Sequence, residues 1–367
     1  MTQTALSARA DITDKALVRS FSYINGKWQA AKDGDSFAVT NPADGTHLGG
    51  VAAMSAEESS TAVDAAQAAF PSWAALLPQE RAAILRRWFE LQLEHKEDLA
   101  RIMVLEQGKP ISEARGEIDY GAAFVEFYAE ESKRPNIEGV TSHLPDAEVE
   151  LWREPVGVAA LITPWNFPSA MLTRKAAAAL AAGCTVVAHP SGETPYSALA
   201  LAELAERAGI PAGVFNVVTG IAPTVVDPWT RDTRVRALSF TGSTEVGSQL
   251  MANCAEHIQK VSLELGGNTP FLVFDDADLD KAVKGAIASK FRNTGQTCVC
   301  VNRFLVQDSI HDAFVEKLKT AIEAMKVGDG LEDGGSQAAL SNRDAADKVM
   351  EHLEDALAKG ARIEAQS

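Results

Sequence analysis

Two cysteines stand two residues apart in the polar, turn-prone stretch FRNTGQTCVC, residues 291–300. Cys298 and Cys300 lack the usual spacing of zinc ligands, no second Cys/His pair accompanies them, and the seven histidines are scattered, so no metal site is expected. A nucleophilic thiolate needs exposure and an electropositive setting. The polar loop and the nearby Arg292 would supply both, so this stretch favours a nucleophilic cysteine.

Two further polar side chains follow predicted strands. In TPWNFP, two prolines stiffen the turn around Asn166 and would hold its amide toward a developing oxyanion. The alternative is an asparagine that only satisfies the local backbone. In LELGG, partial desolvation of Glu264 would raise its pKa and suit it to general-base catalysis. The alternative is an edge glutamate held by the glycine N–H groups.

The stretch SFTGSTEVG, residues 239–247, has the pattern of a strand, a short turn and a helix. The first backbone N–H groups of such a helix are free to bind an anion, and a pyrophosphate would suit that position. The alternative is that Ser243 or Thr244 simply caps the helix. Both interpretations remain open from this stretch alone.

Strands and helices must alternate around these residues. The apolar runs predict strands, and the intervening segments predict helices with apolar residues at three- and four-residue spacing. Such alternation gives a parallel sheet covered on both faces, with ligands beyond the carboxyl ends of the strands, where the polar stretches above fall. The strands are expected at 157–163, 184–190, 214–220, 235–242 and 260–267, and the helices at 169–183, 194–209 and 243–256.

The flanking segments extend this α/β pattern. Residues 23–29 and 35–42 are expected to be short strands joined by a turn, residues 56–135 to be helical, and residues 139–158 to form two extended strands. A second unit begins at about residue 270. It begins with PFLVFDDADLDKAVKGAIASKF, residues 270–291, and the cysteine loop, and is then expected to hold a strand at 303–308 and helices at 310–325 and 344–360.

Composition narrows the class of protein. A chain of 367 residues favours two or more domains. The net charge of −16, without a dense Lys/Arg run, argues against nucleic acid or an anionic membrane as partner. No signal peptide is expected at the N-terminus, and Gly183 interrupts the longest apolar stretch, so no membrane span is expected. The four cysteines, of which Cys184 and Cys254 look structural, suggest a reducing cytoplasm.

The order of TPWNFP, FTGSTEVG, LELGG and FRNTGQTCVC resembles the aldehyde dehydrogenase superfamily, from about Tyr23 to the last residue. ITPWNFPSAMLTRK, SFTGSTEVG and FRNTGQTCVCVNR are most similar to its succinate-semialdehyde branch. The resemblance implies a Rossmann-like doubly wound cofactor domain, an oligomerisation hairpin, an incomplete α/β catalytic domain, and usually a homodimer or homotetramer. The expected boundaries are 1–137 and 158–262 for the cofactor domain, 138–157 for the hairpin and 263–367 for the catalytic part.

The resemblance also implies catalytic roles. Cys298 matches the nucleophile that forms a thiohemiacetal with the aldehyde, and Asn166 with the Cys298 backbone N–H matches the oxyanion hole. Glu264 matches the base that activates water against the thioester, and Lys175 matches a lysine that assists proton movement. Cys300 matches a second cysteine able to form a reversible disulfide with the nucleophile. For Cys300 the alternative is a spectator thiol, which we favour over the disulfide.

The ligands follow from the same resemblance. The substrate is expected to be succinate semialdehyde, whose distal carboxylate Arg174 and Arg292 would bind; glutarate semialdehyde is the alternative, and an inert cofactor-binding remnant is a second alternative. The cofactor is expected to be NADP or NAD. The residues at cofactor-contacting positions are Thr163, Pro164, Trp165, His189, Ser191, Gly192, Gly242, Ser243, Glu264, Leu265 and Gly266.

The sequence departs from the family pattern in three places. His189 replaces the usual lysine, and Gly192 lacks the carboxylate that would repel a 2′-phosphate, which favours NADP over NAD. SQAALSN, residues 336–342, replaces a Gly-Pro-Leu turn. Relatives continue beyond Ser367 with a Glu-Glu-x-Phe-Gly-Pro motif, a substrate-loop serine, further strands and an oligomerisation tail. A sheet without those strands keeps an open edge and an apolar face, so we expect low stability and aggregation.

Overall fold

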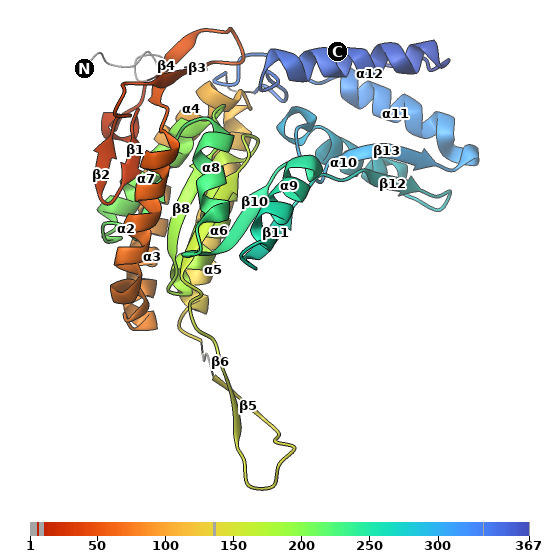
Figure 1. Cartoon of the computed structure of the whole chain (residues 1–367). Coiled ribbons are helices and arrows are strands. Elements are labelled where there is room, and N and C mark those ends of the chain that lie inside the picture. The colour runs from red at the N-terminus through yellow and green to blue at the C-terminus, as the bar shows by residue number, and fades with distance from the viewer. Residues whose placement is uncertain (1–5, 7–10, 135–136, 333, 367) are drawn as a thin grey trace.

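The computed structural model describes residues 6, 11–134, 137–332 and 334–366. A seven-stranded sheet in the order β11-β10-β7-β8-β9-β1-β2 forms its centre (Figure 1). Strands β7 to β11 are mutually parallel, as the sequence predicts, and β1 joins β9 in the antiparallel direction. The strands are β1 (Ser22–Ile24), β2 (Lys27–Gln29), β7 (Val158–Thr163), β8 (Thr185–Pro190), β9 (Phe215–Val217), β10 (Val235–Thr241) and β11 (Lys260–Glu264).

Helices cover both faces of this sheet, which makes the fold doubly wound. In β7, Ala159 and Leu161 belong to one core, while Val158, Ala160 and Ile162 belong to the other, because successive strand residues point to opposite faces. The first core is shared with α3 (Pro78–Glu94), α4 (Lys96–Gln107), α5 (Ile111–Glu131), α6 (Pro168–Ala181) and α7 (Pro195–Arg207). The second is shared with α2 (Ala56–Ala74), α8 (Ala222–Arg231) and α9 (Thr244–Ala255).

Three local features differ from the sequence prediction: one predicted strand is a hairpin, and one strand and one helix were not predicted. Residues 23–29 form the hairpin β1–β2, not one strand, because Asn25 and Gly26 adopt φ of 53° and 70° and make the tight turn that an Asn-Gly pair favours. Strand β3 (Ser36–Thr40) pairs with β4 (His47–Ala52), a strand that the sequence pattern did not indicate. Helix α8 was also missed.

The extended segment around residues 139–158 forms the antiparallel hairpin of β5 (Ile137–Val140) and β6 (Val149–Trp152). Figure 1 shows this hairpin projecting from the body of the molecule. Its strand residues are all exposed. None of the described helices is long and apolar enough to cross a membrane. Residues 1–5 and 7–10, in the segment where no signal peptide is expected, lie outside the described residues.

A smaller unit follows β11. Its two parallel strands pack against helices around a small core of Val273, Val283, Ala286 and Phe314. The cysteine loop joins its first helix to its second strand, so this loop is anchored at both ends. The elements are β12 (Thr269–Val273), α10 (Leu279–Lys290), β13 (Val301–Val306), α11 (His311–Glu323) and α12 (Arg343–Ala358), with three short 3-10 turns at Lys15–Leu17, Arg292–Gly295 and Asp308–Ile310.

Candidate active site

The cysteine loop, residues 291–300, begins with a turn in an unusual backbone conformation. Asn293, Thr294 and Gly295 all have left-handed φ angles, of 52°, 54° and 76°. Glycine adopts this region freely, but a threonine there costs of order 1–3 kcal/mol and persists only when its surroundings hold it. Segment 336–342, which departs from the family pattern, supplies some of that support. Within it, the Ser341 backbone N–H donates to Gln296 Oε1 at 2.9 Å.

Of the four cysteines, all of which are free, Cys298 alone is partly accessible. Burial raises the pKa of the Cys184 and Cys254 thiols, as expected for structural residues. Cys300 is buried, and its Sγ lies 3.9 Å from the carbonyl oxygen of Arg292. The accessibility of the thiols therefore agrees with a nucleophilic role for Cys298.

Asn166 lies directly against the cysteine loop, although 130 residues separate it from its partner. It stands in the turn between β7 and α6, and its Nδ2 donates to the Gln296 carbonyl oxygen at 2.9 Å. Its own carbonyl oxygen accepts a hydrogen bond from Asn293 Nδ2 at 3.0 Å. The amide has a second N–H that this contact does not use, so the side chain remains able to donate to an oxygen near Cys298.

The two predicted arginines meet over one aromatic ring that the sequence did not single out. The guanidinium carbons of Arg174 and Arg292 lie 5.9 and 6.0 Å from the ring centroid of Tyr120. Arg174 also donates to the Tyr120 hydroxyl at 3.2 Å and stacks over Phe124 at 4.7 Å, and Arg292 stacks over Phe167 at 5.0 Å. In the part of the chain that the structure describes, no carboxylate forms an ion pair with either arginine. Their charges are available to an anion.

A first pocket of about 580 Å³ is lined by Arg292, Phe167, Glu113 and Glu117. Lys175 and Glu264 line a second pocket of about 580 Å³, together with Arg174, Ser239 and Thr241. Lys175 Nζ donates to Ser239 Oγ at 2.8 Å. Burial, reinforced by Arg174 and opposed by Glu264, lowers the pKa of Lys175 to about 8, which suits proton exchange near neutral pH.

The expectation that the Glu264 carboxylate is partly desolvated is wrong. Glu264 is exposed at the end of β11, so it is not the partly desolvated carboxylate that its neighbouring glycines suggested. The strand that carries it, β11, is the edge strand of the sheet, and one of its faces stays open. Among the described residues its carboxylate makes no hydrogen bond to the cysteine loop. A general-base role would require access to water, and this position provides it.

A third pocket of about 570 Å³ lies beyond the carboxyl ends of β7, β8 and β10. The hydroxyl of Thr241, at the end of β10, is buried and has no hydrogen-bond partner in the described structure. Adding a Cβ to Gly242 would place it 2.3 Å from the Phe240 ring, so glycine is needed there. Of the predicted cofactor contacts, this pocket is lined by Thr163, Pro164, Trp165, His189, Ser191, Gly192 and Gly242.

The remaining predicted cofactor contacts lie beside this pocket. Ser243 is the N-cap of α9 and accepts a hydrogen bond from the Val246 N–H at 3.3 Å, so the capping alternative is confirmed for it. Leu265 and Gly266 follow β11 and do not line the third pocket. The Leu265 side chain packs on Gly247, where an added Cβ would lie 2.6 Å from it.

His189 is buried in the wall of the third pocket. Its Nδ1 lies 3.0 Å from the Val218 carbonyl oxygen, so Nδ1 carries the proton and donates. Burial lowers the pKa of His189 to about 4, and the ring is therefore neutral at pH 7. Its Nε2 then has a lone pair, which suits a ribose hydroxyl better than a phosphate.

A parallel sheet with a pocket beyond the carboxyl ends of its strands is typical of a nucleotide-dependent enzyme. Residues 28–367 match the model of the aldehyde dehydrogenase family. The chain is 58% identical over 352 residues to succinate-semialdehyde dehydrogenase [NADP(+)] GabD of Escherichia coli, covering 96% of this chain and 73% of that relative. It is 57% identical, with the same coverage, to glutarate-semialdehyde dehydrogenase of Pseudomonas putida. The chain belongs to the aldehyde dehydrogenase family.

Solved structures of similar proteins have the same fold. A crystal structure of an NADP-dependent enzyme of Escherichia coli superposes with a TM-score of 0.95 at 58% identity, covering 96% of this chain and 73% of the other. Betaine aldehyde dehydrogenase of Staphylococcus aureus in complex with NAD+ superposes with a TM-score of 0.92 at 31% identity, covering 99% and 72%. The predicted aldehyde dehydrogenase fold is thereby confirmed.

Proposed function

We propose that this chain oxidises succinate semialdehyde to succinate, with Cys298 as nucleophile and NADP or NAD as cofactor. The choice of substrate rests on two arginines, Arg174 and Arg292. Neither forms an ion pair in the described structure, and both stack over the Tyr120 ring beside the cysteine loop. A short substrate with an aldehyde at one end and a carboxylate at the other fits a thiol and two guanidinium groups. Glutarate semialdehyde is the second candidate, supported by the Pseudomonas relative.

The chemistry divides among the proposed residues. Cys298 Sγ attacks the aldehyde carbon, and the oxygen of the thiohemiacetal becomes negatively charged beside the Asn166 amide and the Cys298 N–H. Conversion to the thioester requires a hydride acceptor, which is the chemistry that the nicotinamide of NADP or NAD supplies. Glu264 then takes a proton from water that attacks the thioester, and this releases the carboxylate product and the thiol. Lys175 exchanges protons with the site.

Removing either substrate arginine should impair binding of the carboxylate selectively. We expect Arg174→Gln and Arg292→Gln each to raise KM for succinate semialdehyde about 10- to 100-fold, since a hydrogen bond to a charged group contributes about 1.5–3 kcal/mol. Butanal, which has the same carbon number without the carboxylate, should be little affected. Initial rates from the absorbance of the reduced nicotinamide measure both substrates.

Arg87→Gln is the matched control, because Arg87 is paired with Glu94 on the surface of α3. Equal losses with butanal and succinate semialdehyde would contradict the carboxylate role. No rate with succinate semialdehyde, glutarate semialdehyde and either cofactor would contradict the proposed function and favour an inert cofactor-binding protein.

Cofactor preference should depend on Gly192. We expect Gly192→Glu to lower the ratio of kcat/KM for NADP to that for NAD about 10-fold or more, because a carboxylate would repel the 2′-phosphate. Gly192→Ala is the control, since an added Cβ lies 3.7 Å from the Phe37 ring, an ordinary contact. Neutral His189 gives the phosphate no charge, so our preference for NADP depends on Gly192. Equal ratios in the two variants would refute it.

We also propose that the hairpin β5–β6 mediates oligomerisation and that the protein is located in the cytoplasm. Val140, Leu144, Leu151 and Trp152 are exposed on the projecting hairpin, and such an apolar surface suits packing against a second copy of the chain in a dimer or tetramer. We retain the division into a cofactor domain (1–137 and 158–262), this hairpin (138–157) and a catalytic part (263–367). The four free cysteines support a reducing cytoplasm.

A further inference from the structure

Lys109 is a buried lysine at the junction of the two loops that form the site. It follows Gly108, whose left-handed φ of 93° ends α4. Its side chain is 0% exposed, its Nζ donates to Glu117 Oε2 at 2.5 Å and to the Asn166 carbonyl oxygen at 2.8 Å, and it lies over the Phe167 ring at 4.2 Å. Lysine is rarely buried without such partners, because removing its charge from water is costly.

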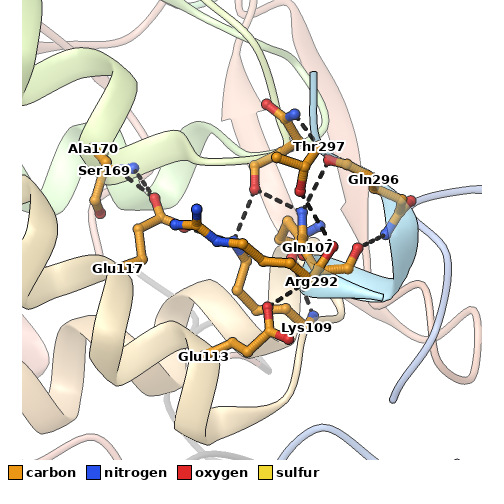
Figure 2. A network of polar contacts seen from close by, with 11 residues as sticks. Gln107, Lys109, Glu113, Glu117, Ser169, Ala170, Arg292, Gln296 and Thr297 are labelled. Atoms are coloured by element: carbon orange, nitrogen blue, oxygen red, sulfur yellow. Dashed lines mark hydrogen bonds and ion pairs between the residues drawn. The ribbon is translucent and has the colours of Figure 1, made fainter. Parts of the chain in front are cut away.

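Glu117 holds the same turn from the other side (Figure 2). Helix α6 begins at Pro168 without a side-chain N-cap of its own. Glu117 Oε1 takes that place and accepts the N–H groups of Ser169 at 2.9 Å and Ala170 at 3.1 Å. The Lys109–Glu117 pair therefore fixes residues 166–170 at both ends.

The contact to Asn166 continues into the cysteine loop. The carbonyl oxygen that Lys109 binds also accepts Asn293 Nδ2, and the Asn166 side chain donates to the Gln296 carbonyl. Glu113 accepts the Asn293 backbone N–H at 2.6 Å. Figure 2 shows the polar network around these contacts, in which the labelled residues include Glu113 and Glu117 on α5, Ser169 and Ala170 at the start of α6, and Gln296 in the loop that leads to Cys298. Moving the Asn166 carbonyl would turn its side-chain amide relative to the loop.

We propose that Lys109 and Glu117 are positioning residues for the oxyanion hole. Lys109 fixes the Asn166 peptide so that the Asn166 amide points toward the oxygen that forms beside Cys298, and Glu117 fixes Lys109. A pair that served stability alone would be replaceable by apolar side chains without loss, since buried ion pairs are often neutral or unfavourable for folding. The inference rests on the proposed roles of Cys298 and Asn166.

The test separates acylation of Cys298 from its alkylation. The ester p-nitrophenyl acetate acylates a thiol through an oxyanion and needs no cofactor, whereas iodoacetamide alkylates it without forming one. In the full chain, we expect Lys109→Met/Glu117→Gln to lower the acylation rate about 10- to 100-fold, as displaced catalytic groups do, while alkylation is unchanged. Glutamine keeps an oxygen for the Ser169 and Ala170 N–H groups and leaves no unpaired buried charge, so the double variant should fold.

Glu106→Gln is the matched control. Glu106 is buried and accepts the N–H groups of Tyr196 and Ser197, both at 2.7 Å, at the start of α7, as Glu117 does for α6, but it does not contact Asn166. We expect its acylation rate to match that of the wild type. Equal acylation in the double variant and the wild type would overturn the inference, as would parallel losses of acylation and alkylation.

A different set of results would contradict the proposed function itself. If Cys298→Ala is acylated at the wild-type rate, or if the wild type is not acylated, Cys298 has no working oxyanion hole and both proposals fall. If Cys298→Ala abolishes acylation while the Lys109→Met/Glu117→Gln variant retains it, the inference alone fails. A melting curve for each variant confirms that the comparison concerns folded protein.

Discussion

Cys298→Ala should abolish aldehyde oxidation. We expect kcat to fall on the order of 10⁴-fold or more, because alanine cannot form the thiohemiacetal and losses of a covalent nucleophile are of this size or larger. The melting temperature should change little, since Cys298 is only half-buried and no hydrogen bond of its thiol is lost among the described contacts. The absorbance of the reduced nicotinamide with succinate semialdehyde measures the rate.

Cys300→Ala is the matched control, because it removes a buried thiol that lies two residues after Cys298 in the chain. It should retain most of the rate in reducing buffer. If Cys298→Ala keeps more than a small fraction of the wild-type activity, or if Cys300→Ala loses that activity, Cys298 is not the nucleophile. The same pair tests the redox hypothesis: peroxide inactivation that dithiothreitol reverses in the wild type but not in Cys300→Ala would support a disulfide between the two cysteines.

The parallel sheet was predictable because its strands are short apolar runs separated by helical segments. β7 and β8 are buried along their whole length, and that is the pattern that a strand between two helical layers requires. The location of the polar stretches at the carboxyl ends of the strands followed from the same alternation. The hairpin β1–β2 was misread although Asn25-Gly26, a strong turn signal, lay within it.

Other parts of the site could not be predicted from local pattern. Lys109 and Glu117 have no local sequence signal that sets them apart from ordinary surface charges. Their burial depends on α6 and on the turn that holds Asn166, some 50 residues later in the chain. Tyr120 became a candidate only when Arg174 and Arg292 met over its ring. The exposure of Glu264 follows from the position of β11 at the sheet edge, which is a property of strand order that no local motif specifies.

Asn166→Ala should reduce turnover more than it reduces substrate binding. Removing one oxyanion donor typically costs about 10²–10³ in kcat, and we expect a loss of this size with KM nearly unchanged, because the charge on oxygen develops only after the thiol attacks. Asn166→Asp should be at least as damaging. It would place carboxylate oxygens against the Gln296 carbonyl oxygen, which now accepts from the amide, and it would repel the oxyanion.

Steady-state kcat and KM for succinate semialdehyde measure the effect, with iodoacetamide alkylation of Cys298 as a check on loop position. Asn302→Ala is the matched control, because this asparagine is exposed on β13 and, among the described contacts, its Oδ1 accepts the Thr269 N–H and it makes no hydrogen bond to Asn166 or Gln296. An unchanged kcat in Asn166→Ala would remove Asn166 from the oxyanion hole. A loss of alkylation equal to the loss of kcat would show that Asn166 acts through the cysteine loop. In that case its bond to Gln296 would matter more than its free N–H.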